Sequence, residues 1–417
     1  MKQFSLSKSL MLFVVVSLLG VFAFIAFFLR GCDGESISMP KLSEKEIEAF
    51  AGYITREGMP PAAFVGTVFE DHDLVFFGDF AYFFNFGFRQ NVDVVINLLP
   101  ALSDKGVHVI GMEQVLAEDQ PLLDRLVSER AFNEEIVRTV LAKSTALLGF
   151  SEYRRFFKAV WEFNRALPRG REPLRVIGLG TKITLEHLAG EKGEQGPDAW
   201  KKALGGKVPE QFIFEVIDRE IIAPGRKALL WMRNDFCMKS VPLEDRTSYY
   251  EKMELSYNGT PAMLALQKKP GRVFCILHHN IWIKTDSKSF SFPLDGLFDT
   301  LIGELPESSL PVAFTVAGSP FADRPLLGAS EPDADSPIAL GKLCDGYVLS
   351  GPLADYRLTP LPDDAVTADT LPLAMQVFPL SADDTTPLSQ ASYVEFINNQ
   401  IALTNDIMDE LPRKPAD

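Results

Sequence analysis

Seven short apolar runs, rich in β-branched and aromatic residues, alternate along this chain with longer stretches of helical periodicity. Short runs with apolar residues at consecutive positions are typical of strands that are buried on both faces. The alternation therefore predicts an α/β fold, with a mostly parallel sheet of about seven strands covered by helices. The predicted strands are 74–77, 107–112, 174–179, 227–232, 272–277, 311–316 and 346–349.

An apolar segment near the amino terminus predicts a membrane anchor. Residues 10–29 contain no charged side chain, and about 20 such residues suffice to cross the hydrocarbon layer as a helix. Lys2 and Lys8 precede the segment, and basic residues favour the cytoplasmic side. We therefore predict a cytoplasmic stub at 1–9, a transmembrane or signal-anchor helix at 10–29, and a soluble part on the extracytoplasmic, periplasmic side of a bacterial envelope.

Two alternatives to a retained anchor stay open. A cleaved signal peptide usually has an apolar region of only about 7–15 residues, which disfavours cleavage here. The residues Leu-Arg-Gly before Cys32 resemble the box at which bacterial lipoproteins are lipidated, although Arg30 stands where a small uncharged residue is usual. Under a retained anchor or lipidation at Cys32, the protein is tethered to the membrane.

The rest of the chain divides by composition. Residues 30–60 form a polar linker with one short helical pattern, and residues 61–350 hold the predicted strands and the helices between them. Residues 351–417 form a tail that is rich in Pro and Asp, with a helical pattern near its end. We predict that this last helix packs on the α/β domain.

Charge and cysteine spacing exclude several functions. The formal net charge of −15 and the pI near 4.9 argue against a nucleic-acid partner, because phosphates require a basic surface. The four cysteines have neither CxxC nor zinc-finger spacing. Disulfide pairing is not assignable from these positions.

Polar side chains follow four of the predicted strands. In a parallel sheet, the carboxyl ends of the strands meet at one edge, where ligands bind in open α/β folds. We therefore predict a crevice for a small-molecule ligand at this edge. Its candidate residues are Asp79 and Tyr82 after the first strand, Glu113 after the second, Arg233 and Asp235 after the fourth, and His278, His279 and Asn280 after the fifth.

Three chemistries are compatible with these residue types. If Asp79 and Glu113 lie close together, their carboxylates raise one another's pKa and can divide acid and base roles. Glu113 and His279 are the candidate catalytic residues. Asp79, Glu113 and His279 could instead hold a divalent metal with open positions. Tyr82 together with a histidine could ligate haem iron.

The order of these motifs resembles the erythromycin esterase-like superfamily, which groups with ChaN-like haem-binding lipoproteins and Tiki-type proteases. Members show a strand ending Gly-Glu-x-x-His, a second strand ending in Glu, an Arg-Asp-x-x-Met segment and a late His-Asn-x-His. This chain has Gly-Asp-Phe-Ala-Tyr at 78–82, then Glu113, then Arg-Asn-Asp-Phe-Cys-Met at 233–238, and His-Asn-Ile-Trp at 279–282. The resemblance implies an α/β domain at 61–350 with a polar ligand crevice.

The departures from the family pattern bear on function. Tyr82 and Trp282 stand where the family has histidines, and neither side chain acts as a general base at neutral pH. The expectation is a membrane-tethered, catalytically divergent protein that binds a small ligand, haem or a metal. Two alternatives stay open: an ester or amide hydrolase that uses Glu113 and His278 or His279, and a pseudoenzyme that acts as an envelope scaffold.

Overall fold

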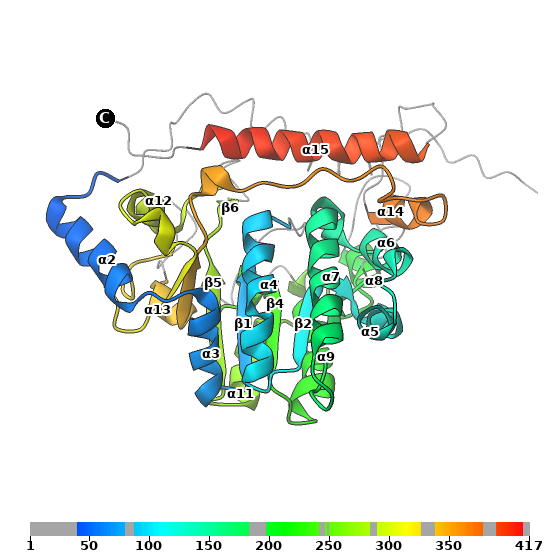
Figure 1. Ribbon diagram of the computed structural model, residues 1–417, viewed down its shortest axis with the longest axis horizontal. Coiled ribbons are helices and arrows are strands. Elements are labelled where there is room, and N and C mark those ends of the chain that lie inside the picture. The colour runs from blue at the N-terminus through cyan, green and yellow to red at the C-terminus, as the bar shows by residue number, and fades with distance from the viewer. Residues whose placement is uncertain are drawn as a thin grey trace, which may run out of the picture.

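The computed structural model describes residues 40–79, 87–182, 197–241, 247, 250–283, 290–326, 338–377 and 389–411 (Figure 1). Its α-helices are α2 (Glu44–Glu57), α3 (Pro61–Asp71), α4 (Arg89–Asp104), α5 (Gln120–Ser128), α6 (Glu134–Ala142), α7 (Phe150–Ala166), α8 (Pro197–Ala203), α9 (Pro209–Ile217), α11 (Pro261–Lys268), α12 (Leu297–Ile302), α13 (Leu340–Leu343), α14 (Leu371–Val377) and α15 (Gln390–Glu410). Its strands are β1 (Leu74–Asp79), β2 (Val109–Leu116), β3 (Arg175–Gly180), β4 (Ala228–Arg233), β5 (Val273–His278), β6 (Trp282–Ile283), β7 (Phe290–Ser291), β8 (Val312–Thr315) and β9 (Gly346–Leu349).

Seven of these strands form one sheet in the order β3-β2-β4-β1-β5-β9-β8. All neighbours in it are parallel except β8 and β9, which pair antiparallel at one edge. Each predicted strand overlaps a strand of this sheet, so the predicted mixed α/β fold with a mostly parallel sheet is confirmed. The small antiparallel pair of β6 and β7 was not predicted, because two-residue strands leave no period to detect.

The sheet lies between two layers of helices, since side chains of successive strand residues point to opposite faces. In β1, Val75 and Phe77 pack in the cluster that includes α3, α4 and α7, whereas Leu74 and Phe76 pack in the cluster that includes α9, α11 and α12. Figure 1 shows α3, α4 and α7 in front of the strands. Both faces of β1 are therefore buried, as its apolar run requires.

The carboxyl-terminal part of the chain lies over the edge of the sheet at which α4 begins (Figure 1). A strap of residues 353–366 runs beneath α15 and is tied to it by two asparagines. Asn405 exchanges hydrogen bonds with the backbone of Leu358, and Asn398 does the same with Leu361. Gln90, at the start of α4, donates to the carbonyl oxygen of Asp355. The edge where β1, β4 and β5 end is thereby covered from above.

The predicted membrane segment at 10–29 lies outside the described residues, as do Cys32 and Tyr82. Within the ranges that the structure describes, none of the helices combines the length and apolar character needed to cross a bilayer.

Candidate functional site

A buried carboxylate lies at the end of β1. Asp79 is 2% exposed, and its Oδ1 accepts a hydrogen bond from Nδ2 of Asn91 on α4 at 2.6 Å. Its Oδ2 accepts from Nε1 of Trp231 on β4 at 2.9 Å. Nδ2 of Asn91 also lies 3.2 Å from Oδ1 of Asn280, which follows β5. We call Asp79, Asn91, Trp231, Asn280 and the nearby His278 the Asp79 centre.

His278 joins this centre from the end of β5. Its ring packs against that of Phe77, which shares the Asp79 face of β1, with 5.8 Å between ring centroids, and its carbonyl oxygen accepts from Nδ2 of Asn280 at 3.4 Å. Nε2 of His278 lies 2.5 Å from Oγ of Ser350, just after β9. Burial, together with the neighbouring His279, lowers the pKa of His278 to about 3, so its imidazole is neutral at pH 7.

Three polar atoms around Asp79 have no hydrogen-bond partner in the part of the chain that is described. They are Oδ1 of Asn91, Nδ1 of His278 and the hydroxyl of Tyr153 on α7. All three side chains are 0–1% exposed. Burial raises the pKa of Tyr153, and the charges of Asp79 and Glu113 raise it further; the Tyr153 ring packs against that of Trp231 with 5.7 Å between centroids. Buried polar atoms in folded proteins nearly always have a hydrogen-bond partner, so these three atoms can accept one from an ordered water or from a ligand.

Position 78 has to be a glycine, because a side chain there would overlap the side chain of Asn234. A Cβ at this position would lie 1.9 Å from Oδ1 of Asn234, which directly follows β4. The amide of Asn234 crosses β1 there: its Nδ2 donates to the carbonyl oxygen of His278 at 2.8 Å, and its Oδ1 accepts from the His278 backbone N–H at 3.0 Å. This amide therefore holds the end of β5 in place beside the Asp79 centre.

A second group of charges lies at the ends of β2 and β4. The backbone N–H of Arg233 donates to Oε2 of Glu113 at 2.8 Å, and Nε of Arg233 lies 3.0 Å from Oε1 of the same carboxylate. Asp235 lies 3.7 Å from the guanidinium, which stacks over the ring of Phe236 at 4.0 Å. Burial raises the pKa of Glu113 to about 7, although the Arg233 charge opposes the shift. We call Glu113 and Arg233 the Glu113 pair.

The predicted site residues therefore fall into two groups, with two residues remaining. Asp79, His278 and Asn280 belong to the Asp79 centre, whereas Glu113, Arg233 and Asp235 form the second group. Of the remaining two, His279 lies apart from both groups, and Tyr82 is outside the described residues.

The expectation for His279 requires correction. As the next residue after His278, it points to the opposite face, where its ring packs against Phe298 and Tyr347. Its Nδ1 lies 3.3 Å from the Tyr347 hydroxyl, and its Nε2 lies 3.2 Å from Oδ1 of Asp299. Both ring nitrogens of His279 therefore have partners within the core, its exposed fraction is 0%, and it lies on the face opposite to the Asp79 centre.

The expected metal and haem ligands do not fit either. Asp79, Glu113 and His279 each bind different partners, and within the described ranges no group of three or more His, Cys, Asp or Glu side chains is arranged to hold a metal ion. Both nitrogens of His279 are hydrogen-bonded inside the core, and Tyr82, the other expected haem ligand, lies outside the described residues. We therefore route no chemistry through a metal or a haem.

Three contributors were not predicted as site residues. Asn91 shares the helix face of Val94, Val95 and Leu98, and a polar residue on an apolar face is a signal that was available in the sequence. Trp231 lies within a fully buried strand, where its N–H needs an acceptor. Tyr153 belongs to an aromatic stripe at helical spacing, which sequence reasoning assigns to packing.

Comparison with known proteins finds no matching protein-family model and no matching curated protein. Solved structures that are similar include a protein from Bacillus cereus, at 11% identity over 74% of this chain and 98% of that chain, with a TM-score of 0.47. A succinoglycan biosynthesis protein matches at 10% identity over 75% and 98%, with a TM-score of 0.49. A mutant of the erythromycin esterase EreC in its open conformation matches at 13% identity over 70% and 93%, with a TM-score of 0.41. Similarities of this size do not establish that the chain belongs to a family.

Proposed function

We propose that this protein binds a small polar ligand at the carboxyl edge of its sheet, and that a polar group of the ligand enters the Asp79 centre. The observation that supports this most directly is the set of unpaired atoms on Asn91, Tyr153 and His278. Each buried polar atom without a partner costs about 1–3 kcal/mol of stability. A ligand that hydrogen-bonds to them recovers part of that cost on binding.

The chemistry of these atoms limits the ligand. The amide oxygen of Asn91 accepts a hydrogen bond, whereas the Tyr153 hydroxyl can donate or accept. The ligand group therefore has at least one donor, as a hydroxyl or an amide has. Because the residues of the Asp79 centre are almost fully buried, only a small group fits there. The rest of the ligand would lie toward the Glu113 pair, whose side chains are 9% and 20% exposed.

The place of binding follows from the predicted anchor. If residues 10–29 span the membrane, the ligand is taken up on the extracytoplasmic side, and the protein stays tethered there. A shortened chain that lacks residues 1–39 would then be found in the soluble fraction.

Replacing Tyr153 by Phe tests the proposal without knowledge of the ligand. Removal of a buried hydroxyl that has no partner should raise the free energy of unfolding by about 1 kcal/mol, measured by urea denaturation. Tyr393→Phe is the matched control, because that buried hydroxyl donates to the carbonyl oxygen of Ala374 at 2.9 Å. The control should lower the free energy of unfolding by about 1 kcal/mol. Equal destabilisation by both variants would contradict the proposal.

The same variants test binding. Small hydroxylated and amide compounds, such as polyols, sugars and amino-acid amides, would be screened for a rise in the melting temperature of the wild-type protein. A compound that binds at the Asp79 centre should lose this effect in Tyr153→Phe and keep it in Tyr393→Phe. A rise that is unchanged in both variants would place the compound elsewhere.

A second candidate function is hydrolysis of an ester or amide, favoured by the pKa of Glu113. A carboxylate with a pKa of about 7 is matched to general-base catalysis near neutral pH, because it is both substantially ionised and basic enough to accept a proton. Arg233 holds this carboxylate in place and would stabilise negative charge on a reacting carbonyl oxygen. In this candidate the base is Glu113, and His279 has no catalytic role.

A further inference from the structure

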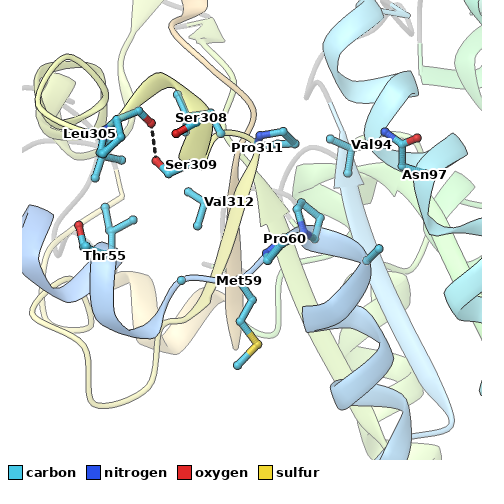
Figure 2. Close-up of a pocket in the computed structure, with 16 residues that line it drawn as sticks. Thr55, Met59, Pro60, Val94, Asn97, Leu305, Ser308, Ser309, Pro311 and Val312 are labelled. Carbon is cyan, nitrogen blue, oxygen red and sulfur yellow. Dashed lines mark hydrogen bonds between the residues drawn. The ribbon is translucent and has the colours of Figure 1, made fainter.

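A groove of about 460 Å³, lined by none of the residues of the Asp79 centre, lies between the end of α2, the start of α3, the middle of α4 and residues 305–312 before β8. Figure 2 shows Thr55 and Leu305 on one side of it and Val94 and Asn97 on the other. None of the sixteen residues that line it carries a charge, in a chain whose residues are 23% charged. This lining selects against ionic ligands.

The groove also holds a large apolar side chain that is exposed. Met59 lines it with 41% of its surface exposed, and it is the one large hydrophobic residue classed as exposed in the described part of the chain. Its backbone is held by two hydrogen bonds with Ala313 of β8, at 2.9 and 2.8 Å. Met59 therefore adds exposed apolar surface to the prolines, Leu305 and Val312 that line the groove.

The walls of the groove are rigid. Four of the lining residues are prolines, at positions 60, 61, 306 and 311. Pro rings fix the backbone angle φ, so little freedom remains to be lost when a ligand binds. In the wall before β8, Oγ of Ser309 donates to the carbonyl oxygen of Pro306 at 2.6 Å (Figure 2). The apolar surface is therefore present before any partner arrives.

The position of Pro40, the first described residue, limits how far the groove can lie from the predicted membrane segment. Pro40 lies against α12, since Oγ1 of Thr300 donates to its carbonyl oxygen at 3.4 Å. The wall at 305–312 follows α12 directly. The predicted membrane segment ends at Leu29, and the eleven residues to Pro40 can span at most about 36–40 Å. The helix α2, about 21 Å long, then leads from this point to the groove.

We propose that this groove accepts a hydrocarbon chain of a membrane lipid, presented by the bilayer in which residues 10–29 are anchored. The lining is uncharged and mostly apolar, as suits an acyl chain, with polar side chains only at Thr55, Asn97, Ser308 and Ser309, and the volume lies in the range of ordinary ligand pockets. The net charge of −15 disfavours anionic headgroups, so the lipid is zwitterionic. This site is independent of the ligand proposed at the Asp79 centre.

The test uses the full-length chain with Cys32→Ser and Met59→Cys, labelled at residue 59 with an environment-sensitive fluorophore. The three described native cysteines are buried, which protects them from the label. The protein is reconstituted in phosphatidylcholine vesicles with or without a nitroxide on the acyl chain. We expect strong quenching by the nitroxide at residue 59. A label at Lys158→Cys, exposed on α7, should be quenched several-fold less.

Blocking variants provide the matched control. Ser308→Trp places a large ring on the exposed rim of the groove and should abolish the quenching at residue 59. Glu307→Trp changes the neighbouring exposed residue, which does not line the groove, and should leave the quenching intact. Quenching that survives Ser308→Trp, or that is equal at residue 158, would overturn the proposal. A protein that does not remain with the vesicles would also overturn it. So would emission at residue 59 that depends on protein concentration and not on the nitroxide, because the occupant of the groove would then be a second copy of the chain.

Discussion

Replacing Asp79 by Ala is expected to lower the free energy of unfolding by about 2–6 kcal/mol, because two buried donors each lose their acceptor at ~1–3 kcal/mol. These donors are the indole N–H of Trp231 and the amide of Asn91. Neither can turn to water, since both side chains are 0% exposed. Urea denaturation followed by circular dichroism measures the loss.

Asp73→Ala is the matched control for this substitution. Asp73 immediately precedes the same strand, and its carboxylate pairs with Arg272 at 2.7 Å where both side chains are partly exposed. Exposed pairs of this kind contribute about 0–1 kcal/mol. Asp79→Asn should fall between the two, because the amide oxygen retains one acceptor while its NH2 group faces a donor. Equal losses for Asp79→Ala and Asp73→Ala would show that the Asp79 centre does not organise this edge.

Replacing Glu113 by Gln should change the dependence of stability on pH. Burial raises the pKa of Glu113 to about 7, so the folded protein binds this proton more tightly than the unfolded chain does. The stability contributed by this carboxyl is therefore greatest below its unfolded pKa of about 4.5 and falls as pH rises to about 7. The loss over that window is up to about 3 kcal/mol.

Glutamine cannot titrate, so the wild type and Glu113→Gln should be similarly stable below pH 4.5. Above pH 7, the variant should be the more stable protein. Glu70→Gln is a control of opposite sign, because the hydrogen bond from Lys105 lowers the pKa of Glu70 and its ionised form is the favoured one. A stability difference for Glu113→Gln that does not vary with pH would contradict the assigned shift.

The same variant decides the hydrolase candidate. If Glu113 is the general base, Glu113→Gln should reduce ester hydrolysis by about 10²–10⁴-fold. The wild-type kcat/KM should rise with pH and level off above about 7, as the base loses its proton. The second measurement separates catalysis from folding, because between about pH 4.5 and 7 the wild-type activity rises with pH while the stability contributed by Glu113 falls. Full activity of Glu113→Gln against a panel of esters would exclude this role.

Much of the fold could be predicted because its information is local. The seven buried runs predict the seven strands of the main sheet, since an apolar run between turn residues has few other stable places in a protein. The same reasoning placed Asp79, Glu113, Arg233 and His278 at one edge, because parallel strands end together. The same two-residue strand period, however, places the adjacent His278 and His279 on opposite faces of the sheet. The sequence pattern does not say which of the two faces the site, because it does not fix the direction of a residue that follows a strand.

The sequence by itself determined the alternation of strands and helices, the carboxyl edge with its polar residues, and a candidate anchor at 10–29. Only the tertiary structure decided which of those polar residues meet. Asn91, Tyr153 and Trp231 are 12, 74 and 152 positions from Asp79, and their contacts depend on helix docking and strand order. Local patterns follow from the backbone geometry of neighbouring residues, whereas partners this distant are chosen by how whole elements pack. Packing thus placed His278 on the same face of the sheet as Asp79 and buried His279 in the opposite layer.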